Sequence, residues 1–241
     1  MNLNNYVVMI TGGSSDIGSA VIARIHREIK CRLLVSNYKT SMEQEKFADR
    51  IINVDLSGRK GITKLCEEIT REKITHYIQL QGYSTLADTL DSQSFETLDI
   101  NMNVNLFSTV FILKTMLRQM RTSNFGRIVL ISTASAEHGG GTDSFGYGLA
   151  KHSVAYLVKH IAKSYSASNI LANCVSPGFI NTKMHELTFK RSKEDLESRE
   201  KFVRVGRSGN PEDVANIIFE LVFNNNFITG ENIKIDGGDF I

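Results

Sequence analysis

The sequence predicts a single-domain α/β fold, a Rossmann-type doubly wound parallel sheet. Short apolar runs alternate with longer segments of helical periodicity along the 241 residues. Several of these runs are continuously apolar, which is typical of strands buried on both faces. Strands that alternate with helices form a parallel sheet covered on both sides, and right-handed connections between them favour double winding.

Seven apolar runs are the expected strands of this sheet. They are Tyr6–Ile10, Arg32–Ser36, Arg50–Val54, His76–Leu80, Arg127–Ser132, Leu171–Val175 and Asn232–Ile235. Three longer segments between them carry apolar residues at helical spacing and are expected helices. These are Ile17–Ile29, Asn101–Met120 and Tyr147–Tyr165.

Length and composition favour one domain that covers residues 1–241. The chain has only two prolines, so no proline-rich linker divides it. The polar stretch at residues 183–205 is the one long insertion between a strand and the next helix. We interpret it as a mobile lid or substrate loop.

Charge and cysteine usage exclude several classes of protein. The formal net charge is +2 and the basic residues are scattered among acidic ones, so we expect no nucleic-acid partner and no membrane attachment. The run Tyr6–Ile10 is too short for a signal-peptide core or a membrane span. Cys31, Cys66 and Cys174 form no C-x-x-C pair, which fits reduced thiols and a cytoplasmic location. The six histidines form no ligand pair with a carboxylate at helical spacing, so no metal site is expected.

A glycine-containing stretch, Thr11–Ala20, follows the first expected strand. Small residues let a backbone approach a pyrophosphate, and the start of a helix offers free N–H groups and a positive dipole end. The strict G-x-G-x-x-G spacing is absent, so a plain turn with a helix cap is an alternative. Asp16 is a favoured residue type for such a cap, and we expect its carboxylate to fold back onto the helix. If it faced the phosphates instead, repulsion would weaken cofactor binding.

Tyr147 and Lys151 lie four residues apart at the start of an expected helix and therefore share a face. An ammonium beside a phenol favours the phenolate and lowers the tyrosine pKa. Such a tyrosine can donate a proton to a carbonyl or accept one from an alcohol. The spacing alone also arises by chance, but here it follows a hydroxyl-rich turn at the carboxyl end of a strand, where this fold binds ligands.

With these motifs in place, the sequence resembles the short-chain dehydrogenase/reductase family from Tyr6 almost to Ile241. The glycine loop resembles T-G-x-x-x-G-I-G with Asp16 in place of the middle glycine, and Tyr147 and Lys151 resemble Y-x-x-x-K. Further matches follow in the family's order: Asp55-Leu56 with the acidic–apolar pair, Gly82 with the glycine of N-N-A-G, Asn105 with the helix asparagine, Pro177–Thr182 with P-G-x-x-x-T, and Gly206–Ala215, Thr229-Gly230 and Asp236–Gly238 with the C-terminal elements.

The resemblance implies four catalytic residues. Tyr147 is the expected general acid in ketone reduction and the base in the reverse reaction. Lys151 is expected to lower its pKa and to hold the nicotinamide ribose, and Asn105 to help hold a water that relays protons. The catalytic hydroxyl falls on Thr133, with Ser132 and Ser135 as alternatives; Thr133 as a mere strand-end residue also stays open.

The resemblance also implies a dinucleotide site. Its expected residues are Gly12, Ser14, Ser15, Asp16, Ile17, Asn37, Asp55, Leu56, Gln81, Gly82, Tyr147, Lys151, Pro177, Gly178, Ile180 and Thr182. Gln81 departs from the small residue that the family places near the adenine, so its side chain must turn away or form a new hydrogen bond.

The end of the second strand favours NADP over NAD. An acidic residue there binds the ribose 2′-hydroxyl in proteins that prefer NAD. Here the position falls on Ser36 or Asn37, neither of which repels a 2′-phosphate, and Lys39 is close enough in sequence to attract one. Ser15 replaces the basic residue that the family places in the glycine loop, so NAD stays an alternative.

The resulting hypothesis is an NAD(P)(H)-dependent oxidoreductase that transfers hydride between nicotinamide and a ketone or secondary alcohol. Its motifs are nearest to those of 3-oxoacyl-carrier-protein reductases, and Arg127 resembles one of their carrier-binding arginines. The second basic position is absent, so a sugar or secondary-metabolite ketone is an alternative substrate. The departures at Asp16, Gln81 and Thr133 leave open a catalytically weak cofactor-binding scaffold. The resemblance further implies a homotetramer that pairs through the helices Asn101–Met120 and Tyr147–Tyr165 and the C-terminal strand.

Overall fold

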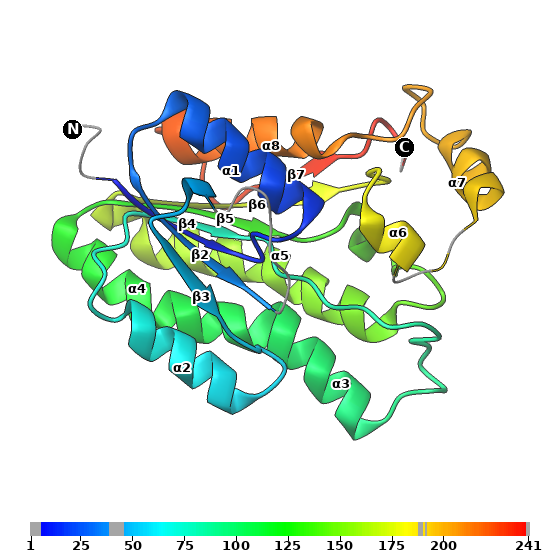
Figure 1. Ribbon diagram of the computed structural model, residues 1–241, viewed down its shortest axis with the longest axis horizontal. Helices are drawn as coiled ribbons and strands as arrows, with labels where there is room; N and C mark the ends of the chain where they lie inside the picture. Colours follow the sequence, from blue (N-terminus) through cyan, green and yellow to red (C-terminus); the bar gives the residue numbers. More distant parts are fainter. Residues whose placement is uncertain (1–5, 39–45, 188–189, 191, 240–241) are drawn as a thin grey trace.

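The computed structural model describes residues 6–38, 46–187, 190 and 192–239. Its centre is one parallel sheet with the strand order β3-β2-β1-β4-β5-β6-β7 (Figure 1). The strands are β1 (Val7–Thr11), β2 (Arg32–Asn37), β3 (Arg50–Asn53), β4 (His76–Gln79), β5 (Gly126–Ile131), β6 (Ile170–Pro177) and β7 (Asn232–Ile235). The predicted doubly wound parallel sheet is therefore confirmed, and each strand end lies within two residues of its expected place.

Helices cover both faces of the sheet (Figure 1). On one face lie α1 (Asp16–Glu28) and α8 (Pro211–Phe219); on the other lie α2 (Arg59–Ile69), α4 (Ser108–Ser123) and α5 (Phe145–Tyr165). The remaining α-helices in the described part of the chain are α3 (Phe95–Met102), α6 (Lys183–Leu187) and α7 (Lys193–Glu200). The expected helix Asn101–Met120 is part of a longer stretch, because α3 continues through a π-helical turn, Asn103–Phe107, into α4.

Two apolar clusters, one on each face, hold these layers together. Ile22 and Ile25 of α1 pack with Ile218 of α8 on one side. Met116 of α4 and Val154 of α5 belong to the cluster on the other side. Each such side chain contributes about 1.5–3 kcal/mol by leaving water. The helical stretch Phe95–Ser123 is long and apolar enough to cross a membrane by composition, but its apolar face packs into this core.

The strand order creates a reversal point at the carboxyl ends of β1 and β4, where doubly wound sheets have a crevice. After β1 the chain builds outward through β2 to β3, and it then returns to place β4 on the other side of β1. In a doubly wound sheet, ligands bind at this reversal point. The glycine loop follows β1 and Gln81-Gly82 follow β4, so both motifs lie at the crevice.

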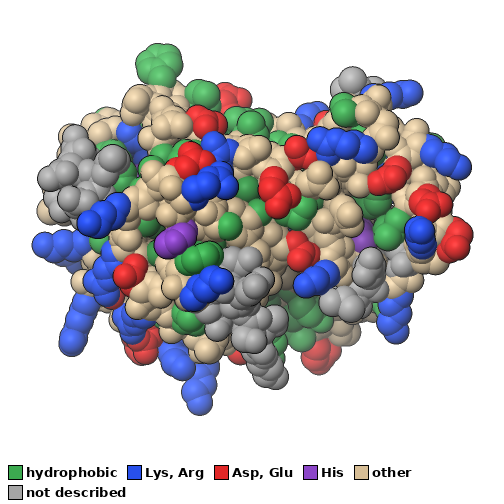
Figure 2. Space-filling view, turned by 45° about the horizontal axis from the view of Figure 1, so that its top comes forward, with side chains coloured by type: hydrophobic (Ala, Val, Ile, Leu, Met, Phe, Trp, Pro, Cys, Tyr) green, Lys and Arg blue, Asp and Glu red, His purple; other side chains and the backbone are tan. Residues whose placement is uncertain are grey.

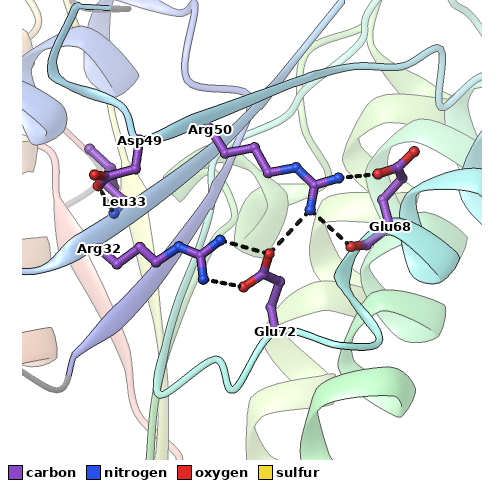
Figure 3. Close-up of polar contacts among 6 residues, drawn as sticks. All are labelled: Arg32, Leu33, Asp49, Arg50, Glu68 and Glu72. Atoms are coloured by element: carbon purple, nitrogen blue, oxygen red, sulfur yellow. Dashed lines mark hydrogen bonds and ion pairs between the residues drawn. The ribbon is translucent and has the colours of Figure 1, made fainter.

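Ion pairs connect β2, β3 and α2 at the opposite end of the strands, their amino ends. Arg32 begins β2, Arg50 begins β3, and both guanidinium groups pair with Glu72 just after α2 (2.9 and 3.1 Å). Glu68 also pairs with Arg50, so four side chains form one network (Figure 3). It lies at the amino ends of the strands and therefore does not contribute to the crevice.

Elsewhere the charges are mixed. On the face shown in Figure 2, acidic and basic side chains are interspersed and no large region of one sign stands out. This arrangement is typical of a solvated surface.

The predicted substrate loop at 183–205 contains two helices, α6 and α7. Arg199 of α7 forms an ion pair with Asp239, whose side chain is only 2% exposed. Val205 N donates to Gly237 O (3.1 Å), so the end of this segment is tied to the C-terminal residues. The segment thus contains two short helices, and its role as a mobile lid or substrate loop stays a prediction. Residues 188–189 and 191 lie outside the described part of the chain.

Candidate active site

The glycine loop turns sharply between β1 and α1. Gly12 has φ +75°, a left-handed conformation that favours glycine, and an added Cβ would clash with the backbone of Gln81. Gly12 N donates to Ser36 O (2.9 Å), which ties the loop to β2. Ser14 and Ser15 complete the turn, and Ile17 lies in the first turn of α1.

The predicted cap of α1 is wrong by one residue. Ser15 is the N-cap, and its Oγ accepts from Gly18 N (3.0 Å). Asp16 is the first helical residue, and its Oδ2 accepts from Lys183 N (2.7 Å) at the start of α6. The carboxylate therefore does not fold back onto α1. It joins the start of α1 to the start of the 183–205 segment, because that backbone N–H is within reach while Ser15 already serves the helix.

Three further residues of the expected nucleotide site follow β2 and β3. Asn37, rather than Ser36, ends β2, and it is 3% exposed. Its Oδ1 lies 3.3 Å from the place of a Cβ on Gly13, so it stands beside the glycine loop. Asp55 Oδ1 accepts from Ser57 N (2.9 Å), and Leu56 is buried. Lys39 lies outside the described residues.

Gln81 turns away from the crevice into a buried polar network. Its Nε2 donates to Ser108 Oγ (3.0 Å) and Thr109 Oγ1 (3.2 Å) of α4, and its Oε1 accepts from Thr11 Oγ1. Of the two outcomes expected for this side chain, both hold: it turns away and forms new hydrogen bonds. It therefore does not crowd a nucleotide.

Tyr147, Lys151 and Asn105 converge on Gly82. A methyl group built on this exposed glycine would lie 3.8 Å from Asn105 Oδ1, 3.9 Å from Lys151 Nζ and 3.9 Å from Tyr147 Cε2. Lys151 Nζ also lies 5.7 Å from the centroid of the Tyr147 ring. The structure thus brings together three of the four predicted catalytic side chains around one open backbone position.

Asn105 lies in the π-helical turn between α3 and α4. Its Oδ1 accepts from Tyr83 N (2.9 Å) and its Nδ2 donates to Tyr83 O (2.8 Å). These two bonds fix the backbone next to Gly82. Single π-helical turns occur frequently at functional sites, where they redirect a side chain.

Burial dominates the protonation of the tyrosine and the lysine. Burial raises the pKa of Tyr147 to about 12. Burial lowers the pKa of Lys151 to about 8, and its ammonium donates to Gln81 O (3.0 Å) and Ile131 O (3.1 Å). In the protein alone, the expected lowering of the Tyr147 pKa by Lys151 is therefore wrong, because loss of water outweighs the nearby charge.

The three candidate hydroxyls after β5 have different partners. Ser132 Oγ donates to Lys151 O (2.7 Å) and is buried, so it ties the end of β5 to α5. Thr133 Oγ1 and Ser135 Oγ share a hydrogen bond of 3.1 Å, and both residues are partly exposed. Thr133 and Ser135 therefore stay as candidates for the side-chain hydroxyl that binds the substrate oxygen. The hydroxyl of Ser132 is already used in a structural bond.

The motif Pro177–Thr182 at the end of β6 leads directly into the 183–205 segment. Pro177 ends β6, and Gly178 N donates to Ile235 O (2.9 Å) of β7. Ile180 is buried and bridges to Gly209. Thr182 O accepts from His185 N (3.1 Å) in the first turn of α6. Thr182 therefore adjoins Lys183, the partner of Asp16, so this motif and the glycine loop meet.

The residues present fit a dinucleotide. The start of α1, capped by the small residue Ser15, provides backbone N–H groups at the reversal point of the sheet. The open position at Gly82 leaves space beside Tyr147 and Lys151. Among the residues that the structure describes, no group of three or more His, Cys, Asp or Glu side chains could hold a metal ion.

Arg127 does not have the exposure that carrier binding needs. Its side chain is buried, and its guanidinium donates to Gly126 O and Asn169 O (both 2.9 Å) and to Asn225 O (3.2 Å). The resemblance of Arg127 to a carrier-binding arginine is thus not supported by its place in the fold.

Sequence reasoning missed two buried residues at the site. Gln79 Oε1 accepts from Ile131 N (3.0 Å) and its Nε2 donates to Gln81 O (3.0 Å), which joins the ends of β4 and β5. Asp88 lies against the first turn of α5. Their partners are 52 and 59 positions away in the sequence, so no local pattern identifies them.

Comparison with known proteins agrees with this geometry. A family profile described as "Enoyl-(Acyl carrier protein) reductase" matches residues 14–239. The chain is 28% identical to the 3-oxoacyl-[acyl-carrier-protein] reductase FabG of Aquifex aeolicus over 250 residues, covering 100% of this chain and 99% of that protein. It is 30% identical to carbonyl reductase family member 4 of Xenopus tropicalis over 237 residues, covering 96% and 97%.

A solved structure shares the fold. The short-chain dehydrogenase/reductase from Serratia marcescens superimposes with a TM-score of 0.85 at 22% identity, covering 100% of both chains. Together with the family profile and the FabG relative, this similarity shows that the chain is a member of the short-chain dehydrogenase/reductase family, nearest to its FabG-like oxidoreductases.

Proposed function

We propose that the protein interconverts a ketone and a secondary alcohol with NADP(H), and less effectively with NAD(H). The observation that carries this proposal is the convergence of Tyr147, Lys151 and Asn105 on the open backbone position Gly82. That position lies at the reversal point of the sheet, next to the start of α1. No scaffold role requires a phenol, an ammonium and an amide at that place.

The chain's own residues handle the proton. Tyr147 donates a proton from Oη to the carbonyl oxygen in reduction and accepts one from the alcohol in oxidation. Lys151 stands beside it to hold the cofactor ribose, and Asn105 fixes the backbone at Gly82. Thr133, or Ser135 beside it, orients the substrate oxygen by hydrogen bonding. A bound nicotinamide supplies or takes up the hydride.

Cofactor preference is inferred from the end of β2. Asn37 carries no charge to repel a 2′-phosphate, in contrast to the acidic residue that binds the ribose 2′-hydroxyl for NAD. Asp16 acts in the opposite direction, because its carboxylate adds negative charge at the start of α1. We therefore infer a preference for NADP with modest affinity.

The first substrates to test are 3-oxoacyl thioesters, since a relative of this chain is named for them. The buried Arg127 removes one argument for a carrier-bound form. A sugar or secondary-metabolite ketone is the alternative substrate.

The three free cysteines support a cytoplasmic location.

A homotetramer is part of the proposal. Phe107, Val110 and Phe111 in and before α4 are 41%, 38% and 48% exposed, and Tyr156 of α5 is 69% exposed. Surface grooves border α4 on the sides of α2 and of α5. Apolar side chains on adjacent outer helices favour pairing with a second copy of the chain.

The test begins with fluorescence titrations of the purified protein with NADPH and NADH. The next step is an assay of 3-oxoacyl thioesters, simple ketones and an enoyl thioester. We expect Tyr147→Phe to lower kcat about 10²–10⁴-fold with the cofactor Kd unchanged. Tyr165→Phe, at the other end of the same helix, is the control and should behave as wild type.

Each outcome has a definite meaning. Micromolar binding of NADPH with turnover of a ketone supports the proposal. Binding without turnover of any carbonyl supports the scaffold alternative. Turnover of the enoyl thioester alone would transfer the proposal to reduction of a carbon–carbon double bond.

A further inference from the structure

The first turn of α5, which carries Tyr147, is not capped by its own N-cap residue. Ser144 occupies that position but makes no side-chain bond to the helix. Its Oγ accepts from Gly141 N (3.0 Å) and donates to Gly141 O (3.1 Å). The free N–H groups that begin every helix therefore need another acceptor.

Asp88, in the loop between β4 and α3, supplies that acceptor twice. Its backbone C=O accepts from Phe145 N (2.7 Å), and its Oδ2 accepts from Tyr147 N (3.2 Å). A carboxylate at the start of a helix also interacts favourably with the helix dipole. The backbone of the proposed general acid is thus bonded directly to a residue 59 positions earlier in the chain.

The loop that presents Asp88 is itself tightly held. Asp88 is 1% exposed, and Gln93 Nε2 donates both to its Oδ1 and to Thr89 O (3.0 Å). Ala87, the preceding residue, has φ +54°. A non-glycine residue in this left-handed region is uncommon, and such conformations concentrate where the surrounding structure demands them. The loop conformation therefore serves the placement of Asp88.

Asp88 and the residue before Tyr147 are closely packed. A Cβ added at Gly146 would lie 3.3 Å from Asp88 Oδ1 and 3.1 Å from Asn101 Nδ2. The buried Asn101 in turn accepts from Asn105 Nδ2 at 3.5 Å. A displacement of Asp88 would therefore move the start of α5, and with it Tyr147, relative to Asn105 and Gly82.

We propose that Asp88 is a positioning residue that sets where the Tyr147 phenol stands beside Gly82. It acts through the backbone of α5 and contacts neither substrate nor cofactor. Only the kinetic part of its test rests on the proposed reductase function, because the bond to Tyr147 N belongs to the protein alone.

The experiment compares three variants by steady-state kinetics, NADPH titration, thermal unfolding and amide hydrogen exchange of the 145–151 segment. We expect Asp88→Ala to lower kcat roughly 10- to 100-fold, since a displacement of about 1 Å has such an effect. The substrate KM and the NADPH Kd should stay within about threefold of wild type. Exchange at the start of α5 should become faster. Asp91→Ala, at an exposed carboxylate of the same loop, is the matched control and should change none of these values.

Asp88→Asn is the rescue variant. Its Oδ1 can still accept from Tyr147 N. Its Nδ2 takes the place of the oxygen that accepts from Gln93 Nε2, so the Gln93 amide must turn over to present Oε1, which has no hydrogen-bond partner among the described residues. We expect kcat within about fivefold of wild type and nearly normal exchange, because geometry rather than charge is restored.

The outcomes separate this proposal from the proposed function. If Asp88→Ala speeds exchange and lowers stability but leaves kcat unchanged, Asp88 is merely structural and the proposal is overturned. Unchanged exchange in Asp88→Ala overturns it as well. If wild type reduces no carbonyl, the proposed function fails, while the exchange comparison still tests the cap. Should Asp88→Ala not fold, Gln93→Ala takes its place: a severalfold lower kcat at unchanged NADPH Kd supports the proposal, and wild-type kcat overturns it.

Discussion

At the scale of single residues, the site depends on an open backbone position. Gly82 is exposed and has ordinary contact distances to Asn105, Lys151 and Tyr147, so nothing in the fold itself forbids a small side chain there. Under the proposed function, the glycine at this position is explained by the space that it leaves beside these three side chains. This distinguishes it from Gly12, whose positive φ and close approach to Gln81 are demands of the fold.

We expect Gly82→Ala to preserve the fold and impair the site. The added methyl group meets no atom closer than 3.8 Å, so the melting temperature should stay within a few degrees of wild type. Because it takes space beside Tyr147 and Lys151, the NADPH Kd or the KM of the ketone should rise at least about tenfold. Titration and kinetics measure these effects. Gly58→Ala, at an open position before α2, is the control, and equal behaviour of the two variants would contradict the expectation.

At the scale of elements, Asp16 connects α1 with α6. The bond from Lys183 N to Asp16 Oδ2 joins residues 167 positions apart and brings a carboxylate to the start of α1. That helix end offers backbone N–H groups and a positive dipole to an anion. A cofactor pyrophosphate bound at this helix end would share one electrostatic environment with the carboxylate, and the two would repel each other.

We expect Asp16→Asn and Asp16→Gly both to bind NADPH about tenfold more tightly than wild type, which corresponds to about 1.4 kcal/mol. The asparagine can keep the bond to Lys183 N but removes the charge, whereas glycine removes both. Equal gains would identify charge as the cause; a gain in Asp16→Gly alone would identify the bond to α6. Weaker binding in both variants would mean that this bond supports the cofactor. Fluorescence titration at two salt concentrations measures the difference, since screening should weaken any effect of charge.

At the scale of the whole molecule, an aromatic cluster closes the end of the sheet opposite the site. His76, at the start of β4, is 1% exposed and packs against the rings of Tyr6, Phe125 and Phe223, with centroid distances of 4.4, 5.5 and 5.1 Å. Burial, and to a smaller extent the positive charge of Arg127, lowers the pKa of His76 to about 3. The imidazole is therefore neutral in the folded protein.

This burial predicts a loss of stability in acid. In the unfolded chain, His76 binds a proton below its ordinary pKa of 6.5. In the folded protein it stays neutral down to about pH 3. The free energy of unfolding therefore falls by up to about 1.4 kcal/mol per pH unit in that window, and His76 contributes nothing to the pH dependence above it. We expect His76→Phe to lose less stability than wild type between pH 6.5 and about pH 4 in urea titrations. Parallel pH profiles of the two proteins would contradict the assignment.

The proposed tetramer is tested on the outer face of α4. We expect the wild-type protein to have a tetrameric mass in light scattering coupled to size exclusion. Phe111→Glu should lower that mass, because it places a charge among the exposed apolar residues of this face. Phe95→Glu, at an exposed position in α3, is the control. A wild-type monomer, or an unchanged mass in Phe111→Glu, would refute the pairing mode.

Sequence periodicity alone determined the seven strands, their parallel arrangement and the helix that carries Tyr147 and Lys151. The reason is local: continuous apolar runs and 3.6-residue patterns report burial directly. The same reasoning placed Tyr147 and Lys151 on one face, since their spacing is a single turn of helix.

Only the tertiary structure decided how distant segments meet. Asp16 accepts from the backbone of Lys183, and Asp88 from the backbone of Tyr147. Gln81 bonds to Thr11 and Ser108 on two other elements. Hydrogen-bond partners of polar side chains depend on which segments the sheet brings together, and hydrophobic periodicity carries no information about them. For the same reason the predicted cap at Asp16 was wrong, because it needed the competing partner on α6. The pKa of Tyr147 in the protein alone is raised rather than lowered, because it depends on the depth of burial.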